Sequence, residues 1–140
     1  MRAGRSGSFN AHGRAAASPA RATPRALGAR AEEVVADHLK ARGLEVIGRN
    51  VRVGRLEIDL IARDGPVIII VEVRNRGASS YQRALDSIDA RKRARIRAAG
   101  ERLWQTRFAA DPALERMRFD VASVTFLPGG AEVEYIKAAF

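Results

Sequence analysis

The stretch LEIDLIARDGPVIIIVEVRNR, residues 56–76, decides the fold of this chain. Residues 67–71 are apolar without interruption, which is typical of a strand covered on both faces of a sheet. Residues 64–66, Asp-Gly-Pro, predict a turn. Residues 56–62 alternate, so we expect one face to hold Leu56, Ile58, Leu60 and Ala62, and the other Glu57, Asp59 and Ile61. The stretch therefore predicts a β-hairpin over residues 56–74.

Two acids, Asp59 and Glu72, interrupt this apolar stretch. An unpaired buried carboxylate costs free energy, so a positive charge has to accompany them. A turn centred on Asp64-Gly65 would place Asp59 opposite Ile70 and Glu57 opposite Glu72. The Cβ atoms of Asp59 and Glu72 would then lie within roughly 7–8 Å on one face. Carboxylates at that range suit Mg²⁺ or Mn²⁺ held partly through water.

Ion pairs could satisfy the same acids without a metal. Arg74 and Arg76 lie two and four residues beyond Glu72 and share its face. A network of this kind clusters acids with arginines just as a metal site does. The residues alone leave both interpretations open.

The rest of the chain predicts an α/β (α+β) domain in the order α-βββ-α-ββ, a mixed β-sheet flanked by helices. Apolar spacing predicts a helix from Leu27 that stops at Gly43, followed by strand residues 44–53. A second helix is expected from an N-cap at Ser87 or Asp89 to about Phe108. Strands are expected over 117–126 and 131–137. Residues 1–26, rich in Arg, Ala, Gly and Ser, predict a disordered basic tail, and residues 27–140 one domain.

Composition narrows the class of protein. The 140 residues carry a formal net charge of +9, and six arginines precede the first acid, Glu32. A basic balance favours a polyanionic partner, DNA or RNA. The absence of cysteine excludes thiolate metal sites and disulfides. No apolar run reaches the ~18 residues of a membrane span, and no signal-peptide pattern is present, so we expect a cytoplasmic protein without a membrane partner. The oligomeric state stays open, a dimer included.

Six segments carry a resemblance to a known family. An acid on one strand followed by Glu-x-Lys on the next is the core of the restriction-endonuclease-like nucleases. More closely, the chain resembles, in order along residues 27–140, the bacterial YraN-type family of predicted endonucleases through LGARAEEVVADHL, RLEIDLIARDG, VEVRNR, ARKRARIRAAGERLW, RFDVASVTF and EYIKAAF.

The resemblance implies a restriction-endonuclease-like core and a Mg- or Mn-dependent endonuclease site. Glu32 matches the family's helical acid, Asp59 and Glu72 match its metal-binding acids, and Glu57 matches a supporting acid. Arg74 stands where the family pattern has lysine, and Leu56 replaces a glycine. Arginine can stabilise charge and bind phosphate, but it does not take up the role of a proton carrier near neutral pH.

Five basic residues are candidates for nucleic-acid contact: Arg74, Arg76, Arg91, Lys92 and Arg95. Lys92 is the lysine nearest to the candidate site in sequence order, and nucleases of this class can recruit the lysine from a neighbouring element. The competing interpretation is a solvated helix surface.

We therefore expect a nucleic-acid-binding protein with a metal-dependent phosphodiesterase site made by Glu32, Asp59, Glu72 and Arg74, in which the three acids hold the metal. Two alternatives stay open. One is a non-catalytic nucleic-acid-binding module whose nuclease site has decayed at position 74. The other is a protein-interaction domain whose acids make only structural ion pairs.

Overall fold

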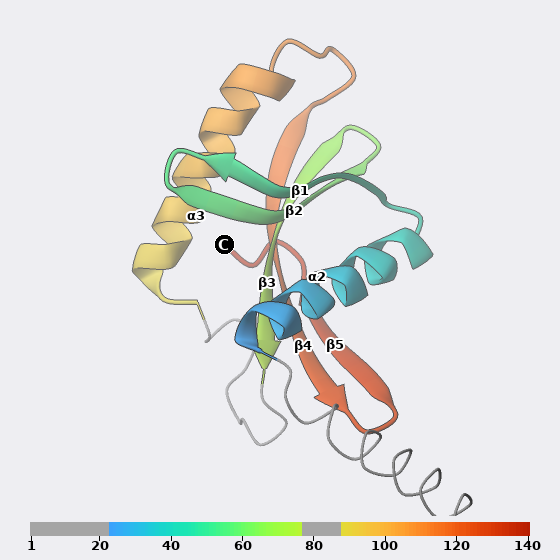
Figure 1. Ribbon diagram of the computed structural model, residues 1–140. Helices are drawn as coiled ribbons and strands as arrows, with labels where there is room; N and C mark the ends of the chain where they lie inside the picture. The colour runs from blue at the N-terminus through green and yellow to red at the C-terminus, as the bar shows by residue number, and fades with distance from the viewer. Residues whose placement is uncertain (1–22, 77–87) are drawn as a thin grey trace, which may run out of the picture.

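A five-stranded mixed sheet lies between two helices (Figure 1). The computed structural model describes residues 23–76 and 88–140. Within them the elements are α2 (Pro24–Ala41), β1 (Glu45–Val53), β2 (Leu56–Asp64), β3 (Val67–Arg76), α3 (Ala90–Leu103), the π-helical turn η3 (Trp104–Phe108), β4 (Arg116–Leu127) and β5 (Gly130–Ile136). The predicted order, α-βββ-α-ββ, is confirmed.

Helix α2 begins at Pro24, three residues before the start predicted at Leu27. The Thr23 side chain accepts a hydrogen bond from the Ala26 amide at 3.0 Å and so caps the helix. Pro24 follows at the first helical position, where its missing N–H costs nothing. Residues 24–26 of the predicted tail are therefore helical, and the tail's residues 1–22 lie outside the described residues.

Strand β3 is buried on both faces, as its apolar run predicts. Ile68 and Ile70 pack with α3 residues, whereas Ile69 and Val71 pack with α2 residues. β3 pairs antiparallel with β2 and parallel with β4. The chain passes through α3 between β3 and β4. Helix α3 covers one face of the sheet, and α2 covers the other (Figure 1).

The β2–β3 hairpin turns at Gly65-Pro66, one residue later than predicted. Asp64 pairs with Val67 and Leu60 with Val71, so the predicted pairing of Asp59 with Ile70 and of Glu57 with Glu72 is wrong by two residues. Gly65 takes a positive φ of 57°, which the tight turn requires. Asp59 and Glu72 are the residues next to the last pair of this ladder, Leu60 with Val71.

The predicted alternation of β2 is wrong near Asp59. Ile58 packs on the α3 side with Ile61, whereas Leu60 packs on the α2 side. Opposite this break lies Asn50, between the pairs Arg49–Leu60 and Val51–Ile58, with a positive φ of 48°. The hairpin of β1 and β2 therefore bends here and curves toward α3 (Figure 1).

Helix α3 starts at the predicted N-cap, where Asp89 Oδ1 accepts from the Lys92 amide at 2.8 Å. Its buried stripe includes the predicted Ile96, Ala99 and Leu103. Neither helix in the described part of the chain combines the length and apolar character that crossing a lipid bilayer takes.

Candidate functional site

Asp59 lies where β2 separates from β3. The paired residues end at Leu60 and Val71, so the Val73 amide has no β2 partner in this ladder. Asp59 Oδ2 accepts the hydrogen bond from that amide at 2.8 Å. The separation of the two strands thus fixes the Asp59 carboxylate beside Glu72, whose side chain is only 6% exposed.

The two acids share one electrostatic environment. Burial and the negative charge of Glu72 raise the pKa of Asp59 to about 7, although the Val73 amide and the Lys92 ammonium act in the opposite direction. Two neighbouring carboxylates whose negative charges repel each other form a site that favours an added cation. Their oxygen donors fit Mg²⁺ or Mn²⁺, which proteins bind through one or two carboxylates and several waters.

Two basic side chains approach Glu72. Arg74 Nη1 lies 3.6 Å and Lys92 Nζ 3.7 Å from Glu72 Oε2. Both distances exceed that of a hydrogen bond, so the contacts are ion pairs. Arg74 comes from β3 itself, and Lys92 comes from the first turn of α3. The fold therefore brings a lysine to Glu72 from a neighbouring element.

Glu32 stands beside this pair on α2. Its Oε1 accepts from Asn50 Nδ2 at 2.9 Å, and the same amide nitrogen lies 3.5 Å from Glu57 Oε1. A cavity of about 290 Å³ opens between Glu32, Asn50 and Glu57. Burial raises the pKa of Glu32, the Asn50 hydrogen bond lowers it, and the charges of Asp59 and Glu57 raise it again.

Of the three predicted metal ligands, only Asp59 and Glu72 lie close enough to act together. Across residues 23–76 and 88–140, no group of three Asp, Glu or His side chains is arranged to hold one metal ion. Asp59 and Glu72 form the pair, and the negative charge of Asp59 raises the pKa of Glu32 on α2.

The remaining predicted residues lie farther along the same elements. Arg76 Nη1 makes an ion pair with Glu134 Oε1 on β5 at 3.2 Å. Arg91 and Arg95 are exposed on α3. Of the five predicted nucleic-acid residues, the structure places Arg74 and Lys92 at Glu72.

Sequence reasoning did not single out Asn50 as a site residue. Its amide joins Glu32 on α2 to Glu57 on β2, and its positive φ produces the bend at Asp59. The signal was present as Gly48 and Asn50 inside an otherwise regular strand, because Asn tolerates the left-handed region better than most residues.

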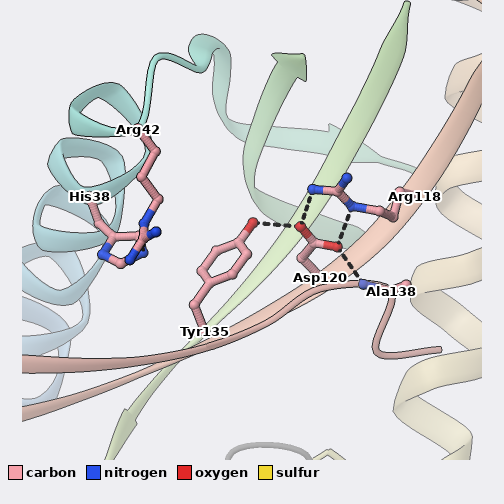
Figure 2. A network of polar contacts seen from close by, with 6 residues as sticks. All are labelled: His38, Arg42, Arg118, Asp120, Tyr135 and Ala138. Atoms are coloured by element: carbon pink, nitrogen blue, oxygen red, sulfur yellow. Dashed lines mark hydrogen bonds and ion pairs between the residues drawn. The ribbon is translucent and has the colours of Figure 1, made fainter.

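A second buried carboxylate, Asp120, was also missed (Figure 2). Asp120 is fully buried and accepts from Arg118 Nε and Nη2, both at 2.9 Å, from the Tyr135 hydroxyl at 2.6 Å, and from the Ala138 amide at 2.8 Å. Burial and the hydrogen bond from its hydroxyl to Asp120 raise the pKa of Tyr135. The carboxylate oxygens of Asp120 are thus already occupied by hydrogen bonds. Because the donors include Tyr135 on β5 and Ala138 after it, the network holds β5 and the following segment against β4.

Comparison with known proteins gives a consistent family. The sequence model described as "Uncharacterised protein family UPF0102" matches residues 31–124. A UPF0102 protein of Sorangium cellulosum (strain So ce56) is 68% identical over 126 residues, which cover 89% of this chain and 88% of the relative. UPF0102 proteins of Pseudomonas paraeruginosa (strain DSM 24068 / PA7) and Halorhodospira halophila (strain DSM 244 / SL1) are each 39% identical, over 86% and 84% of this chain and 96% and 88% of the relatives.

These matches include the helix of Glu32, both acidic strands and α3. They confirm the resemblance that the sequence carries to the YraN-type family. The chain therefore belongs to UPF0102, an uncharacterised protein family.

Proposed function

We propose that this protein binds nucleic acid and hydrolyses phosphodiester bonds with a divalent metal held at Asp59 and Glu72. The observation that carries the proposal is the Asp59–Glu72 pair itself, placed where two core strands separate. Burial and the neighbouring acid raise the pKa of Asp59 to about 7. Because Asp59 is hard to ionise in the folded protein, its ionised form destabilises the metal-free protein. A bound cation offsets that destabilisation.

The chemistry needs positive charge on both sides of the scissile phosphate. Hydrolysis forms a bond from the water oxygen to phosphorus and breaks the bond to one sugar oxygen, which leaves with a proton. A bound Mg²⁺ or Mn²⁺ would supply charge neutralisation and a lowered pKa for the attacking water. The protein's part is to hold the carboxylates in place through the Val73 amide and to exclude water around Glu72.

Lys92 is our candidate for the lysine that the family pattern has at position 74. Its Nζ lies 3.7 Å from Glu72 Oε2, at nearly the same distance as Arg74 Nη1. Lys92 would stabilise developing negative charge beside the site, and Arg74 would hold a phosphate oxygen through its guanidinium. Glu32 and Glu57 would orient waters around the pair through Asn50.

The deciding experiment is cleavage of single-stranded, duplex and branched DNA and RNA with Mg²⁺, Mn²⁺ or EDTA. We expect metal-dependent cutting that Asp59→Asn and Glu72→Gln each abolish. Glu33→Gln is the matched control, because Glu33 neighbours Glu32 but pairs with Arg49 at the surface. Cutting that survives both site variants would refute the proposal and indicate a contaminating nuclease.

A non-catalytic nucleic-acid-binding module is the second candidate. It is favoured by the ion pairs that Arg74 and Lys92 already make with Glu72, which satisfy one acid without metal. That candidate predicts binding with no cutting under any metal. A protein-interaction domain, the third, predicts neither binding nor cutting.

A further inference from the structure

We propose that a groove between α3 and the β1–β2 turn binds the phosphate backbone of the nucleic-acid strand that leaves the candidate site. We call it the arginine groove and define it by Arg55, Arg95 and Arg102, with Val53, Leu56 and Ala98 between them. This inference rests on the proposed function and assigns its substrate a path.

The bend at Asn50 creates the groove. It turns the β1–β2 hairpin toward α3, so the tip of the hairpin faces the helix (Figure 1). The space between them measures about 280 Å³. Arg102 lies over the turn, since a Cβ added at Gly54 would be 3.6 Å from Arg102 Nη1. One wall therefore carries Arg55 and the other carries Arg95 and Arg102.

The groove is positively charged without compensation. None of its lining residues is acidic. Within the described residues, no ion pair or hydrogen bond engages the side chains of Arg55, Arg95 or Arg102, in contrast to Arg49 and Arg76, which pair with surface acids. Three neighbouring guanidiniums repel one another, and a string of phosphates relieves that repulsion.

The groove continues from the candidate site along one face of α3. Lys92, Arg95 and Arg102 are separated by three and seven residues, so they lie on the same side of the helix. Lys92 is the residue that contacts Glu72. At 1.5 Å per residue, the distance along the helix from Lys92 to Arg102 is about 15 Å. At 3.4 Å per nucleotide of a duplex strand, that is roughly four nucleotides.

The chemistry of the groove favours phosphate over an acidic protein segment. Guanidiniums bind phosphate oxygens in a bidentate manner. The apolar residues between the arginines can contact sugars, and a strand held here would extend directly to Lys92 and Glu72. An acidic peptide would gain nothing from that continuity.

The test measures the salt dependence of binding by fluorescence anisotropy, with the full chain in EDTA. Arg55→Gln, Arg95→Gln and Arg102→Gln are combined in one groove variant. Lys40→Gln, Arg116→Gln and Lys137→Gln form the control, which removes the same charge from exposed positions outside the groove. A triple Arg→Lys groove variant keeps the charge, and circular dichroism confirms that each variant folds.

We expect the groove variant to lower the slope of log K against log salt by about 2–3, at about 0.7–0.9 per lost phosphate contact. The control should change it by less than one, and the Lys variant should retain most of it. Equal losses in the groove and control variants would overturn the proposal, as would an unchanged slope in the groove variant.

A second measurement separates this inference from the nuclease proposal. Neutral methylphosphonates are placed singly along a bound oligonucleotide. A run of about four sensitive positions in the wild type, insensitive in the groove variant, supports the groove even if no cleavage occurs. If cleavage occurs but sensitivity is the same in both proteins, the groove fails and the nuclease proposal stands.

Discussion

The Asp59 carboxylate accepts the hydrogen bond that the Val73 amide would otherwise make to a paired strand. Its Oδ2 accepts the Val73 amide at 2.8 Å where β2 has left β3. A side chain fixed by a backbone hydrogen bond keeps one position without help from flexible partners. Because asparagine can accept the same bond through its amide oxygen, Asp59→Asn removes the charge and leaves the contact.

Metal should stabilise the folded protein. A ligand that binds only the native state adds about 2.7 kcal/mol at 100 times its Kd. We expect Mn²⁺ or Mg²⁺ to raise the Tm, Asp59→Ala to abolish the rise, and Glu33→Gln to leave it unchanged. The measurement is thermal unfolding with and without metal. A wild-type Tm that is indifferent to metal would favour the ion-pair interpretation.

Stability should depend on pH through Asp59. Its pKa is raised to about 7 in the folded state from 3.8, so between these values the folded state holds more protons than the unfolded state. The free energy of unfolding contributed by this group therefore falls as pH rises from about 4 to 7. In EDTA, the free energy of unfolding of Asp59→Asn should exceed that of the wild type by a few kcal/mol at pH 8, at about 1.4 kcal/mol per pKa unit. At pH 4 the two proteins should differ little.

Urea unfolding across that range checks the sign, with the difference between the two proteins as the readout. Parallel pH profiles would contradict the raised pKa. Metal binding at pH 6.5 should also release protons, since it favours the ionised carboxylate.

If the site is active, Arg74 and Lys92 should each contribute to the rate of cleavage. Arg74→Ala is expected to slow cleavage roughly 10²–10³-fold, the effect of losing one preorganised charge, while Arg74→Lys should retain activity. Lys92→Ala should slow it by a similar factor without changing the Tm rise on metal addition. Single-turnover rates measure both. If wild type binds without cutting and Arg74→Lys restores cleavage, the site has decayed at position 74.

The Asp120 network should be a large source of stability. Tyr135→Phe removes the 2.6 Å hydrogen bond to a buried carboxylate and should cost about 1–3 kcal/mol. Asp120→Ala leaves Arg118 and the Ala138 amide without their acceptor and should cost about 3–5 kcal/mol. Ser123→Ala is the control on the same strand, because the buried Ser123 Oγ has no hydrogen-bond partner among the described residues. Denaturant midpoints that rank Ser123→Ala with Asp120→Ala would contradict this assignment.

Gly100→Ala should destabilise the protein although alanine is the better helix former. A Cβ at Gly100 would lie 2.7 Å from ring carbons of Phe119, and this overlap should cost about 1–3 kcal/mol against a propensity gain of about 1. Gly28→Ala in α2 is the control, because nothing lies within 4 Å of its added Cβ. We expect the Tm to fall for Gly100→Ala and to rise for Gly28→Ala.

The sequence by itself determined the elements and their order. The run 67–71 predicted a strand covered on both faces, and Asp89 predicted the start of α3, because apolar periodicity and helix capping depend on neighbours along the chain. The sequence also selected Asp59 and Glu72 as acids that need a partner. It missed the cap at Thr23 and Pro24, although both signals are local.

Only the tertiary structure decided which groups meet. The hairpin register depended on whether Asp64 or Gly65 begins the turn, a choice of one residue that local preferences do not resolve. The break in alternation at Asp59 came from the bend opposite it at Asn50. Lys92 reaches Glu72, Tyr135 reaches Asp120, and Arg102 faces the β1–β2 turn across separations of 15 to 48 residues. Such contacts depend on how helices pack on the sheet, because a side chain's distant neighbours are set by the packing of whole elements rather than by its own surroundings in the sequence.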